Sequence, residues 1–544
     1  MRFGQTFYLL LLLGIGLAPG CNQAKRIEKT SVPTSRPTLE IDLDNVVATI
    51  DGLTYGSNQK LIPEVRLRRI GGNRMTGYNW EINSSNSGND GNHTSYRWLN
   101  SLVGMDPTDS RPAAWILKNL ELHKSDNADS VVTIPLAGYV VADGNDTFVS
   151  PDETAPSKRW VQVQAAKPGS NFGSPDLHDG KVFVDEKVAW LVSKAGTADK
   201  GGPAYYSLDN EPSLWSRTHA RLHPGKTAYN ELSSKSIAAA KAILDVDPAA
   251  KIIGPALYGW YGHASLQDAP DNKAINKSYG NFSAYFLSQM RIASENKGKR
   301  LLHIFDFHWY PEAQGGGTRI SGLEGGSLTT DEIVQARLQA PRSLWDSGYV
   351  EDSWIAKSNG KQPIQLIPRM QKIIKDNYPG TRLGILEYNY GGGHHVSGGL
   401  ATADALGIFG RFGVASCLWA EQEDNQFEKA AFRLFLNYHG QGSSFQENAL
   451  DVPQLKPELE SIYASRSEDS KSVTVVLINK QPKNILKKQI LIKGVQESGK
   501  LRSFRFGPEQ PEILPVSEKE LRSVKGGFEI ECPPQTATLV EVQF

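Results

Sequence analysis

The stretch YYSLDNEP, residues 205–212, decides the fold that we expect for this chain of 544 residues. Its aromatic and apolar first half favours a β-strand, while Pro212 ends the strand and favours an extended backbone at Glu211. The stretch therefore predicts that the Glu211 carboxylate stands at the carboxyl end of a buried strand. Barrel enzymes carry their catalytic groups at such strand ends.

A second stretch, LGILEYNY at residues 383–390, has the same design. Apolar residues lead into Glu387, aromatic residues follow it, and three glycines occupy positions 391–393. Two glutamates that each end a strand among aromatic rings predict the paired carboxylates of a glycosidase. A gap of about 5 Å between the carboxyl groups would give retention of configuration, and about 6.5 to 9.5 Å would give inversion. The sequence leaves that gap open.

The segments around these two stretches predict an α/β fold, a (β/α)8 barrel of the TIM type. Helical patterns at residues 233–244, 282–293 and 368–377 lie between apolar runs, as this barrel requires. Residues 316–362 are poor in strand patterns, so we expect a loop or a helical insertion beside the cleft. The eight strand-like runs are residues 53–58, 64–71, 131–140, 204–211, 251–257, 301–309, 383–390 and 415–421.

From about residue 437 the pattern changes to short strands separated by Pro, Gly and charged turns. The chain is therefore expected to form a catalytic barrel over residues 51–436 and a β-sandwich over 437–544. The strand-like stretch 39–50 precedes the barrel, and we expect it to join the sandwich. The strands expected in the sandwich are residues 472–479, 489–493, 501–506, 527–531 and 536–542.

The N-terminus has the features of a targeting segment. Arg2 precedes an apolar run, residues 7–17, that is shorter than the about 20 residues of a membrane-spanning helix, so residues 1–20 are expected to be a signal peptide. The residues before Cys21 resemble a bacterial lipobox, which predicts a lipid on Cys21, with simple cleavage as the alternative. Residues 21–38 are rich in Lys, Thr, Ser and Pro and are expected to be a flexible tether. We therefore expect a secreted lipoprotein of the bacterial cell envelope or outer membrane, which contacts the membrane only through this anchor.

The composition and the missing motifs exclude several classes of binding partner and enzyme. Lys plus Arg and Asp plus Glu both number 59, which disfavours nucleic acid, because nucleic acid needs a basic face. The sequence has no G-x-S-x-G elbow and no H-E-x-x-H zinc motif. We expect a monomer that needs no cofactor for catalysis, and the metal content stays unknown. The acidic stretches at 143–146 and 152–153 leave a structural calcium site open.

Five motifs together resemble glycoside hydrolase family 44. The resemblance covers about residues 45 to 544 and implies a barrel with a β-sandwich and retaining endo-β-1,4-glucanase activity, in many members also on xyloglucan. It implies that Glu211 is the general acid/base and Glu387 the nucleophile. One departure is Ile70, which stands where many relatives carry an aromatic residue. The motifs are RIGGN at 69–73, YNWEIN at 78–83, YSLDNEP at 206–212, HWYP at 308–311 and EYNYGG at 387–392.

Further residues near the motif glutamates are expected to bind substrate. Asn210 is placed to hydrogen-bond the sugar 2-hydroxyl, and Asn73 closes the first motif. Because side chains alternate along a strand, His308 and Tyr310 point to one side, where Tyr310 can orient Glu387 and Arg69 can hold its charge. The aromatic residues expected to line the cleft are Tyr78, Trp80, Trp215, Tyr388, Tyr390 and Trp419.

The sequence thus predicts a hydrolase of β-glucan, whether cellulose-like, xyloglucan or mixed-linkage. Another β-glycanase, such as a xylanase or a mannanase, is the nearest alternative. A non-catalytic surface glycan-binding lipoprotein is the alternative from another class. Such a protein should have lost a motif glutamate, and this chain has both.

Overall fold

The structure is a computed structural model that describes residues 38–169, 172–420, 424–495 and 499–544. The predicted signal peptide, Cys21 and the tether up to residue 37 lie outside the described residues, as does residue 421 of the last predicted barrel strand. Within the described ranges, no helix combines the length and the apolar character needed to cross a bilayer.

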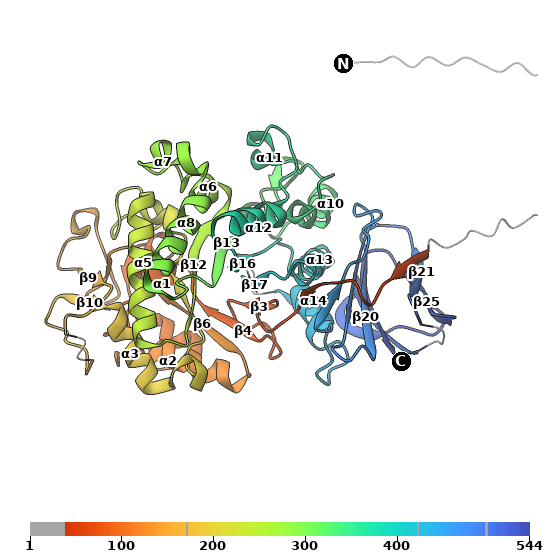
Figure 1. The fold of residues 1–544 in the computed structure, drawn as a ribbon, viewed down its shortest axis with the longest axis horizontal. Helices are drawn as coiled ribbons and strands as arrows, with labels where there is room; N and C mark the ends of the chain where they lie inside the picture. The colour runs from red at the N-terminus through yellow and green to blue at the C-terminus, as the bar shows by residue number, and fades with distance from the viewer. Residues whose placement is uncertain (1–37, 170–171, 421–423, 496–498) are drawn as a thin grey trace, which may run out of the picture.

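Eight parallel strands close into a barrel, in the order β3-β4-β6-β11-β12-β13-β16-β17 (Figure 1). Each of the eight strand-like runs contributes one of them, so the predicted (β/α)8 barrel is confirmed. The strands are β3 (Gly56–Ser57), β4 (Leu67–Ile70), β6 (Asp129–Ile134), β11 (Tyr205–Leu208), β12 (Lys251–Tyr258), β13 (Ile304–His308), β16 (Arg382–Tyr388) and β17 (Ala415–Leu418).

Helices follow every barrel strand except β3, whose connection to β4 is irregular. The three predicted helical patterns correspond to α5, α8 and α12. The insertion over residues 316–362 contains three short helices joined by irregular segments, α9 (Gly322–Gly325), α10 (Asp331–Gln339) and α11 (Trp354–Ser358). The long helices are α2 (Ala114–Ser125), α3 (Val184–Ala195), α5 (Tyr229–Val246), α8 (Phe282–Lys297), α12 (Leu366–Asn377), α13 (Val396–Phe412) and α14 (Gln426–Leu436), and the short ones are α1 (Asn73–Thr76), α4 (Trp215–Thr218), α6 (Gly259–Ser265) and α7 (Asn272–Tyr279).

The predicted strand over residues 131–140 is wrong in its second half. Strand β6 ends at Ile134, where Pro135 follows, and Gly138 has φ 106°. Residues Tyr139–Val141 then form β7, which pairs with β9 (Trp160–Gln164) in a separate sheet that β10 (Lys181–Phe183) completes. Proline lacks the N–H that a ladder requires, so the chain leaves the barrel at that point.

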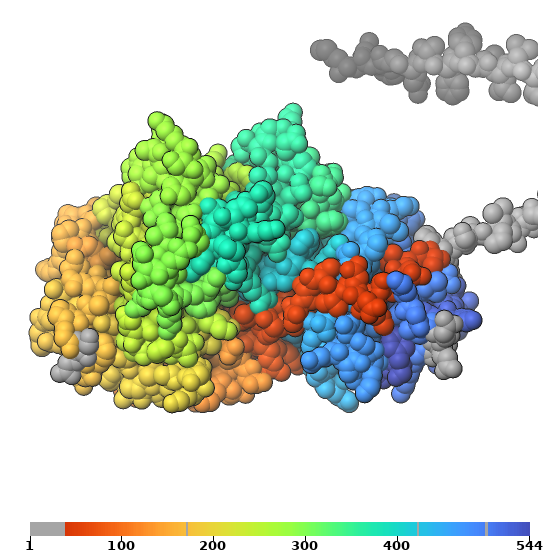
Figure 2. Space-filling model, in the orientation of Figure 1, coloured from red at the N-terminus to blue at the C-terminus, as the bar shows by residue number. Residues whose placement is uncertain are grey.

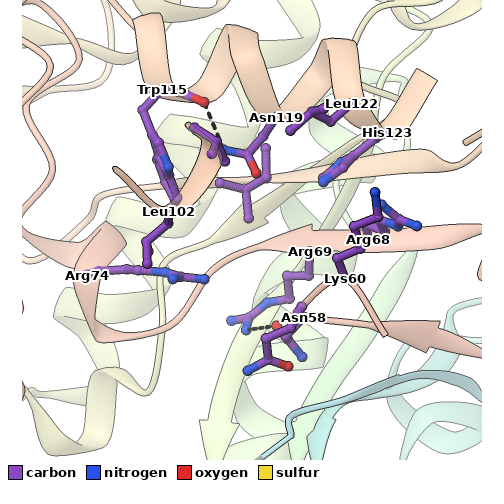
Figure 3. Close-up of a pocket in the computed structure, with 13 residues that line it drawn as sticks. Asn58, Lys60, Arg68, Arg69, Arg74, Leu102, Trp115, Asn119, Leu122 and His123 are labelled. Carbon is purple, nitrogen blue, oxygen red and sulfur yellow. Dashed lines mark hydrogen bonds between the residues drawn. The ribbon is translucent and has the colours of Figure 1, made fainter. Parts of the chain in front are cut away.

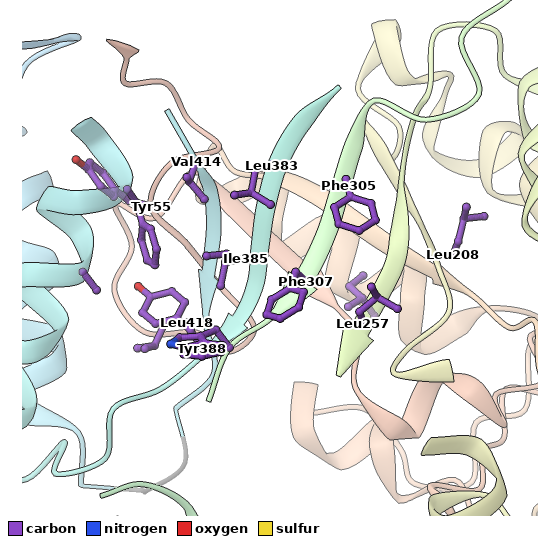
Figure 4. Packing of buried hydrophobic residues seen from close by; sticks show 14 of the residues in the cluster. Tyr55, Leu208, Leu257, Phe305, Phe307, Leu383, Ile385, Tyr388, Val414 and Leu418 are labelled. Carbon is purple, nitrogen blue, oxygen red and sulfur yellow. The ribbon is translucent and has the colours of Figure 1, made fainter. Parts of the chain in front are cut away.

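Barrel strands bury both of their faces, which explains their nearly continuous apolar sequences. Outward side chains such as Phe305 and Phe307 of β13 and Leu383 and Ile385 of β16 belong to one large cluster with the surrounding helices (Figure 4). A smaller cluster takes one or two residues from each of seven barrel strands and fills the interior. Its buried members are Leu67, Val131, Tyr205, Ile253, Ile304, Leu386, Ala415 and Cys417.

The C-terminal region forms two sheets, one of seven strands and one of four. Strands β1 and β2 of the N-terminal segment join them, because β1 pairs with β21 and β2 pairs with β18. The seven-stranded sheet contains β2 (Val46–Thr49), β18 (Asn448–Leu450), β19 (Glu460–Arg466), β20 (Ser472–Asn479), β26 (Thr536–Gln543), β22 (Lys500–Gly507) and β23 (Gln510–Pro515), and the four-stranded sheet contains β1 (Thr38–Ile41), β21 (Leu486–Ile492), β25 (Gly527–Cys532) and β24 (Leu521–Val524).

The sandwich packs on barrel helices α13 and α14. Gly407 of α13 lies directly against the ring of Tyr463 on β19, where a β-carbon would collide with the ring. Figure 2 shows the N-terminal segment, in red, lying on the surface across the junction between barrel and sandwich. The sandwich therefore covers one flank of the barrel, away from the ends of strands β4, β11 and β13.

Candidate active site

A cavity of about 670 Å³ lies at the carboxyl ends of the barrel strands and contains both motif glutamates. Its position agrees with the place where barrel enzymes build their sites. Its walls come from the carboxyl ends of strands β12 and β16 and from the segments that follow strands β4, β11, β13 and β17. The residues that line it are Gly72, Asn73, Arg74, Ser87, Asp90, Trp98, Asn210, Glu211, Tyr258, Tyr310, Arg319, Leu323, Glu387 and Trp419.

Glu211 sits on a turn rather than on the strand. Strand β11 ends at Leu208, and Asp209 and Glu211 adopt left-handed backbone angles, with φ of 61° and 43°. The extended backbone predicted for Glu211 is therefore wrong. Such angles cost a non-glycine residue on the order of 1–3 kcal/mol and occur mostly at functional sites.

Long-range hydrogen bonds hold this turn and override the preference that Pro212 imposes. The buried Asp209 carboxylate accepts from the Thr76 hydroxyl at 2.6 Å and from the backbone N–H of Ala137 at 3.2 Å. It also accepts from the N–H of Asn210 at 2.7 Å. The N–H of Glu211 donates to the carbonyl of Ala256 at 2.9 Å, so three distant chain segments fix the turn.

Glu387 is held on β16 by two donors, the ones that the sequence predicted for it. Nη1 of Arg69 lies 2.5 Å from one carboxylate oxygen, and the hydroxyl of Tyr310 donates to the other at 3.0 Å. Arg69 is fully buried, so its charge acts on Glu387 with little screening by water. Trp309 is buried on the other side of its strand, as alternation predicts.

His308 lies between the two glutamates. Its Nδ1 is 3.0 Å from an oxygen of Glu211 and 3.4 Å from an oxygen of Glu387. One carboxylate oxygen of each glutamate and one His308 nitrogen all lie within 4.8 Å of one another. The two carboxyl groups thus face each other across the cavity, at the shorter of the two separations found in glycosidases.

The surroundings of Glu211 and His308 shift the pKa values of both side chains. Burial raises the pKa of the Glu211 carboxyl above its ordinary value, and the charge of Glu387 adds to this effect although the hydrogen bond from His308 opposes it. Burial alone would lower the pKa of His308, but Glu387, Asp306 and Glu211 raise it to about 10. His308 is therefore a protonated donor at neutral pH. Glu211, His308 and Glu387 are also a group among the described residues whose ligand atoms lie close enough together to hold a metal ion.

Asn210 and Asn73 stand beside the acid. The side-chain oxygen of Asn210 accepts from Nη2 of Arg69 at 2.8 Å, and its amide donates to the Asn73 side chain at 3.1 Å. Both residues line the cavity. Arg69 therefore connects Glu387 to Asn210, which fixes the geometry of the two motifs relative to each other.

Of the six aromatic residues predicted to line the cleft, only Trp419 does so. The other five are buried, because their rings pack against other parts of the protein instead of facing the cavity. Tyr388, for example, packs on Phe409 of α13 with ring centroids 5.0 Å apart, and the Trp215 indole donates to the Asn210 carbonyl at 3.2 Å. The buried five are Tyr78, Trp80, Trp215, Tyr388 and Tyr390.

Trp98 and Tyr258 line the cavity but were missed from the sequence. Trp98 is 46 % exposed, which suits a ring that meets a ligand. Its signal was weak because it lies in a long irregular connection, 15 positions beyond the end of the YNWEIN motif (98 minus 83). Tyr258 is the last residue of β12, and an earlier end predicted for that strand hid it.

The acidic stretches considered for calcium carry other contacts. The carboxylates of Asp143 and Glu153 both face the guanidinium of Arg159, at 2.8 Å and 3.4 Å. Glu153 also accepts from the backbone N–H of Ser150 at 3.1 Å. Calcium binding at these stretches stays a prediction.

Comparisons with known proteins identify relatives of this chain. The sequence model of glycoside hydrolase family 44 matches residues 76–313. An endoglucanase A from Paenibacillus lautus is 44 % identical over 449 residues, which are 81 % of this chain and 63 % of that protein. A β-mannanase/endoglucanase A from Caldicellulosiruptor saccharolyticus is 41 % identical over 473 residues, which are 84 % of this chain and 35 % of that protein.

Solved structures extend the likeness to both regions of the fold. The family 44 xyloglucanase of Paenibacillus polymyxa superposes with a TM-score of 0.88 at 38 % identity, covering 93 % of this chain and 99 % of that chain. This chain thus spans nearly all of the solved relative but less than two thirds of the length of the two curated relatives.

Proposed function

This chain belongs to glycoside hydrolase family 44, and we propose that it is an endo-acting hydrolase of β-1,4-glucan chains that works with retention of configuration. Cellulose-like chains, xyloglucan and mixed-linkage glucan are the proposed substrates. The names of the relatives, endoglucanase and xyloglucanase, support this choice. No cofactor is required in this proposal.

In the proposed first step, Glu387 attacks the anomeric carbon while Glu211 gives its proton to the leaving oxygen. The two donors on Glu387, Arg69 and Tyr310, hold the nucleophilic carboxylate in place for this attack. Burial favours the protonated form of Glu211 that this step requires. In the second step Glu211 takes a proton from water, and the hydroxide attacks the glycosyl–Glu387 ester. The His308 hydrogen bond then stabilises Glu211 in the ionised form that accepts the proton.

The observation that carries the proposal is the approach of Glu211 and Glu387 oxygens to within 4.8 Å across the cavity. Inversion needs room for a water between the carboxyl groups, about 6.5 to 9.5 Å.

The test of this proposal is Glu387→Gly, assayed on an aryl β-cellobioside with and without azide. Hydrolysis should be abolished, and azide should restore product with inverted configuration. Activity equal to the wild type without azide would end the assignment.

Another β-glycanase activity is the second candidate, because one relative carries the name β-mannanase/endoglucanase. A panel of glucan, xylan and mannan with sizing of the products separates the two. Release of oligosaccharides from β-glucan at less than a tenth of the rate on mannan or xylan would replace the first candidate by the second. A binding protein without activity is disfavoured by the two facing carboxylates.

The place of action is part of the proposal. We propose secretion and a lipid on Cys21, which the lipobox-like sequence before it supports. The tether would let a monomeric enzyme reach polymers outside the envelope. Incorporation of a labelled fatty acid into the wild type, and its loss in Cys21→Ser, tests this point. Equal label in both proteins would contradict it.

A further inference from the structure

A second cavity, of about 300 Å³, adjoins the cleft and shares Arg74 with it. This side cavity lies between strand β4 and helix α2 (Figure 3). Its size is at the lower end of small-molecule pockets, about 300–1,000 Å³. None of its lining residues is acidic. They are Asn58, Gln59, Lys60, Arg68, Arg69, Ile70, Arg74, Leu102, Val103, Trp115, Asn119, Leu122 and His123.

Four cationic side chains line the side cavity, and two of them have an unused donor. Arg68 and Arg69 are only 4 % and 1 % exposed, yet the Nε of each has no hydrogen-bond acceptor. Arg68 is neutralised by Asp126, at 2.7 Å, and Arg69 by Glu387. His123 adds no charge at neutral pH, because burial lowers its pKa to about 3. The excess positive charge therefore comes from Arg74 and from Lys60 at the exposed rim.

Arg74 forms the wall between the two cavities. Its Nε donates to the Gly71 carbonyl at 3.0 Å, and its guanidinium carbon lies 5.3 and 5.7 Å from the ring centroids of Trp115 and Trp419. Among the described residues, no acidic side chain forms an ion pair with it. Its two terminal nitrogens thus lie beside two indoles, and no side-chain acceptor for them is found among the described residues.

The other charged groups of the cleft differ from Arg74 because each already has a polar or charged side chain as its partner. Arg319 pairs with Glu312 at 3.0 Å, Glu387 with Arg69, and Glu211 with His308. The Asp90 carboxylate accepts from the Asn73 amide at 2.9 Å. A planar guanidinium held in place without a counter-charge matches the two oxygens of a carboxylate.

We propose that the side cavity, with Arg74 at its junction with the cleft, binds a carboxylate group carried by the glycan, as on an acidic sugar or an acidic substituent. The inference rests on the proposed function, because a glucan chain in the cleft would pass Trp419, which lines the cleft and lies 5.7 Å from the Arg74 guanidinium carbon. Arg74 is then a specificity-determining residue. It extends the substrate class from neutral to acidic β-glucans and leaves the bond cleavage to Glu211 and Glu387.

The experiment compares two soluble cellulose derivatives of equal substitution, hydroxyethyl cellulose, which is neutral, and carboxymethyl cellulose, which is anionic. Arg74→Gln should lower kcat/KM about tenfold on the anionic polymer, mainly through KM, and less than twofold on the neutral one. Arg74→Lys keeps the charge without the fork and should give an intermediate loss. Lys372→Gln removes an equal charge from the exposed face of α12 and should change neither value.

Equal losses on both polymers, or no loss on either, would overturn the inference and leave the proposed function standing. If the wild type cleaves neither polymer, the proposed function itself fails. Lys60→Gln, at the exposed rim, covers the case in which Arg74→Gln does not fold. Lys60→Gln should lower kcat/KM on the anionic polymer two- to threefold. If the ratio of kcat/KM on the anionic polymer to kcat/KM on the neutral polymer equals the wild-type ratio in both Lys60→Gln and Arg74→Lys, the inference is overturned. Added salt should lower kcat/KM of the wild type on the anionic polymer relative to the neutral polymer, and it should change this ratio little in the variants.

Discussion

Two buried charged clusters in this molecule are built on opposite principles. At the junction with the sandwich, Asp404 of α13 accepts from the Tyr463 hydroxyl at 2.5 Å and pairs with Lys480 at 2.7 Å, and Lys480 also donates to the Pro457 carbonyl at 2.9 Å. Every side-chain polar atom of this junction cluster has a partner.

The active-site cluster is not satisfied in the same way. The Nε of Arg69 is buried without a hydrogen-bond partner, and the Nε2 of His308 faces an oxygen of Asp306 at 3.6 Å, too far for a hydrogen bond. Glu211 also sits at a positive φ. Buried polar groups in a stable fold are normally all paired, so the difference indicates which cluster stabilises the fold and which one serves chemistry.

The largest effect should come from Glu211→Gln. The variant keeps the shape of the side chain but cannot donate or accept the catalytic proton, so kcat on a glucan should fall about 10²- to 10⁴-fold. The loss should be much smaller on a substrate whose leaving group needs no proton, such as a dinitrophenyl cellobioside. Thermal unfolding at pH 7 should show no loss of stability. A variant that unfolds earlier than the wild type would contradict the separation of the two clusters.

A change in the junction cluster should lower the stability of the protein and leave its activity nearly unchanged. Asp404→Ala leaves the buried Lys480 charge without its partner, which costs about 3–5 kcal/mol of unfolding free energy. Denaturant unfolding measures this cost. At temperatures where the variant stays folded, kcat/KM on a soluble glucan should stay within twofold of the wild type. The double variant Asp404→Leu, Lys480→Met should recover most of the stability, because no charge is left unpaired.

Tyr310→Phe should have a smaller effect, confined to the active site. The change removes one hydrogen bond to a charged oxygen of Glu387, worth about 1.5–3 kcal/mol. A loss in kcat of roughly 10- to 100-fold is expected, because the donor orients the nucleophile. Phe keeps the ring, so circular dichroism and unfolding should match the wild type. A kcat equal to that of the wild type would mean that Arg69 alone orients Glu387.

The sequence predicted the barrel and the identity of both glutamates because these depend on local patterns. Parallel strands buried on both faces are continuous apolar runs, and each motif glutamate follows one directly. The strained turn at Glu211 could not be predicted, because its causes are Thr76, Ala137 and Ala256, which are far away in the sequence.

The aromatic residues show a second limit of the sequence. Tyr388 and Trp419 both stand near strand ends, and only the helices packed outside the barrel decide that one ring is buried and the other faces the cavity. Strands β18, β19, β23 and β24 of the sandwich were missed from the sequence. Strands β18 and β24 are short, with three and four residues, and β23 contains two prolines. Patterns with a period therefore predict elements, whereas the surroundings of a single side chain depend on the whole fold.

The smallest expected effect is on the pH dependence of the unfolding free energy, which Glu211 of the active-site cluster should influence. Burial raises the pKa of Glu211 in the folded state, so the folded protein binds this proton more tightly than the unfolded chain does. That contribution to stability is fully present below the ordinary pKa of glutamate and is lost as pH rises through the raised value, at up to about 1.4 kcal/mol per unit. His308 acts in the same direction, since its raised pKa stabilises the fold at low pH and the benefit is lost as pH rises toward about 10.

Glu211→Gln removes the contribution of Glu211 and weakens that of His308, so the unfolding free energy of the variant should fall less than that of the wild type between pH 5 and pH 8. Denaturant unfolding of both proteins at the two pH values measures the difference, and parallel slopes would mean that Glu211 ionises in the folded protein as it does in water.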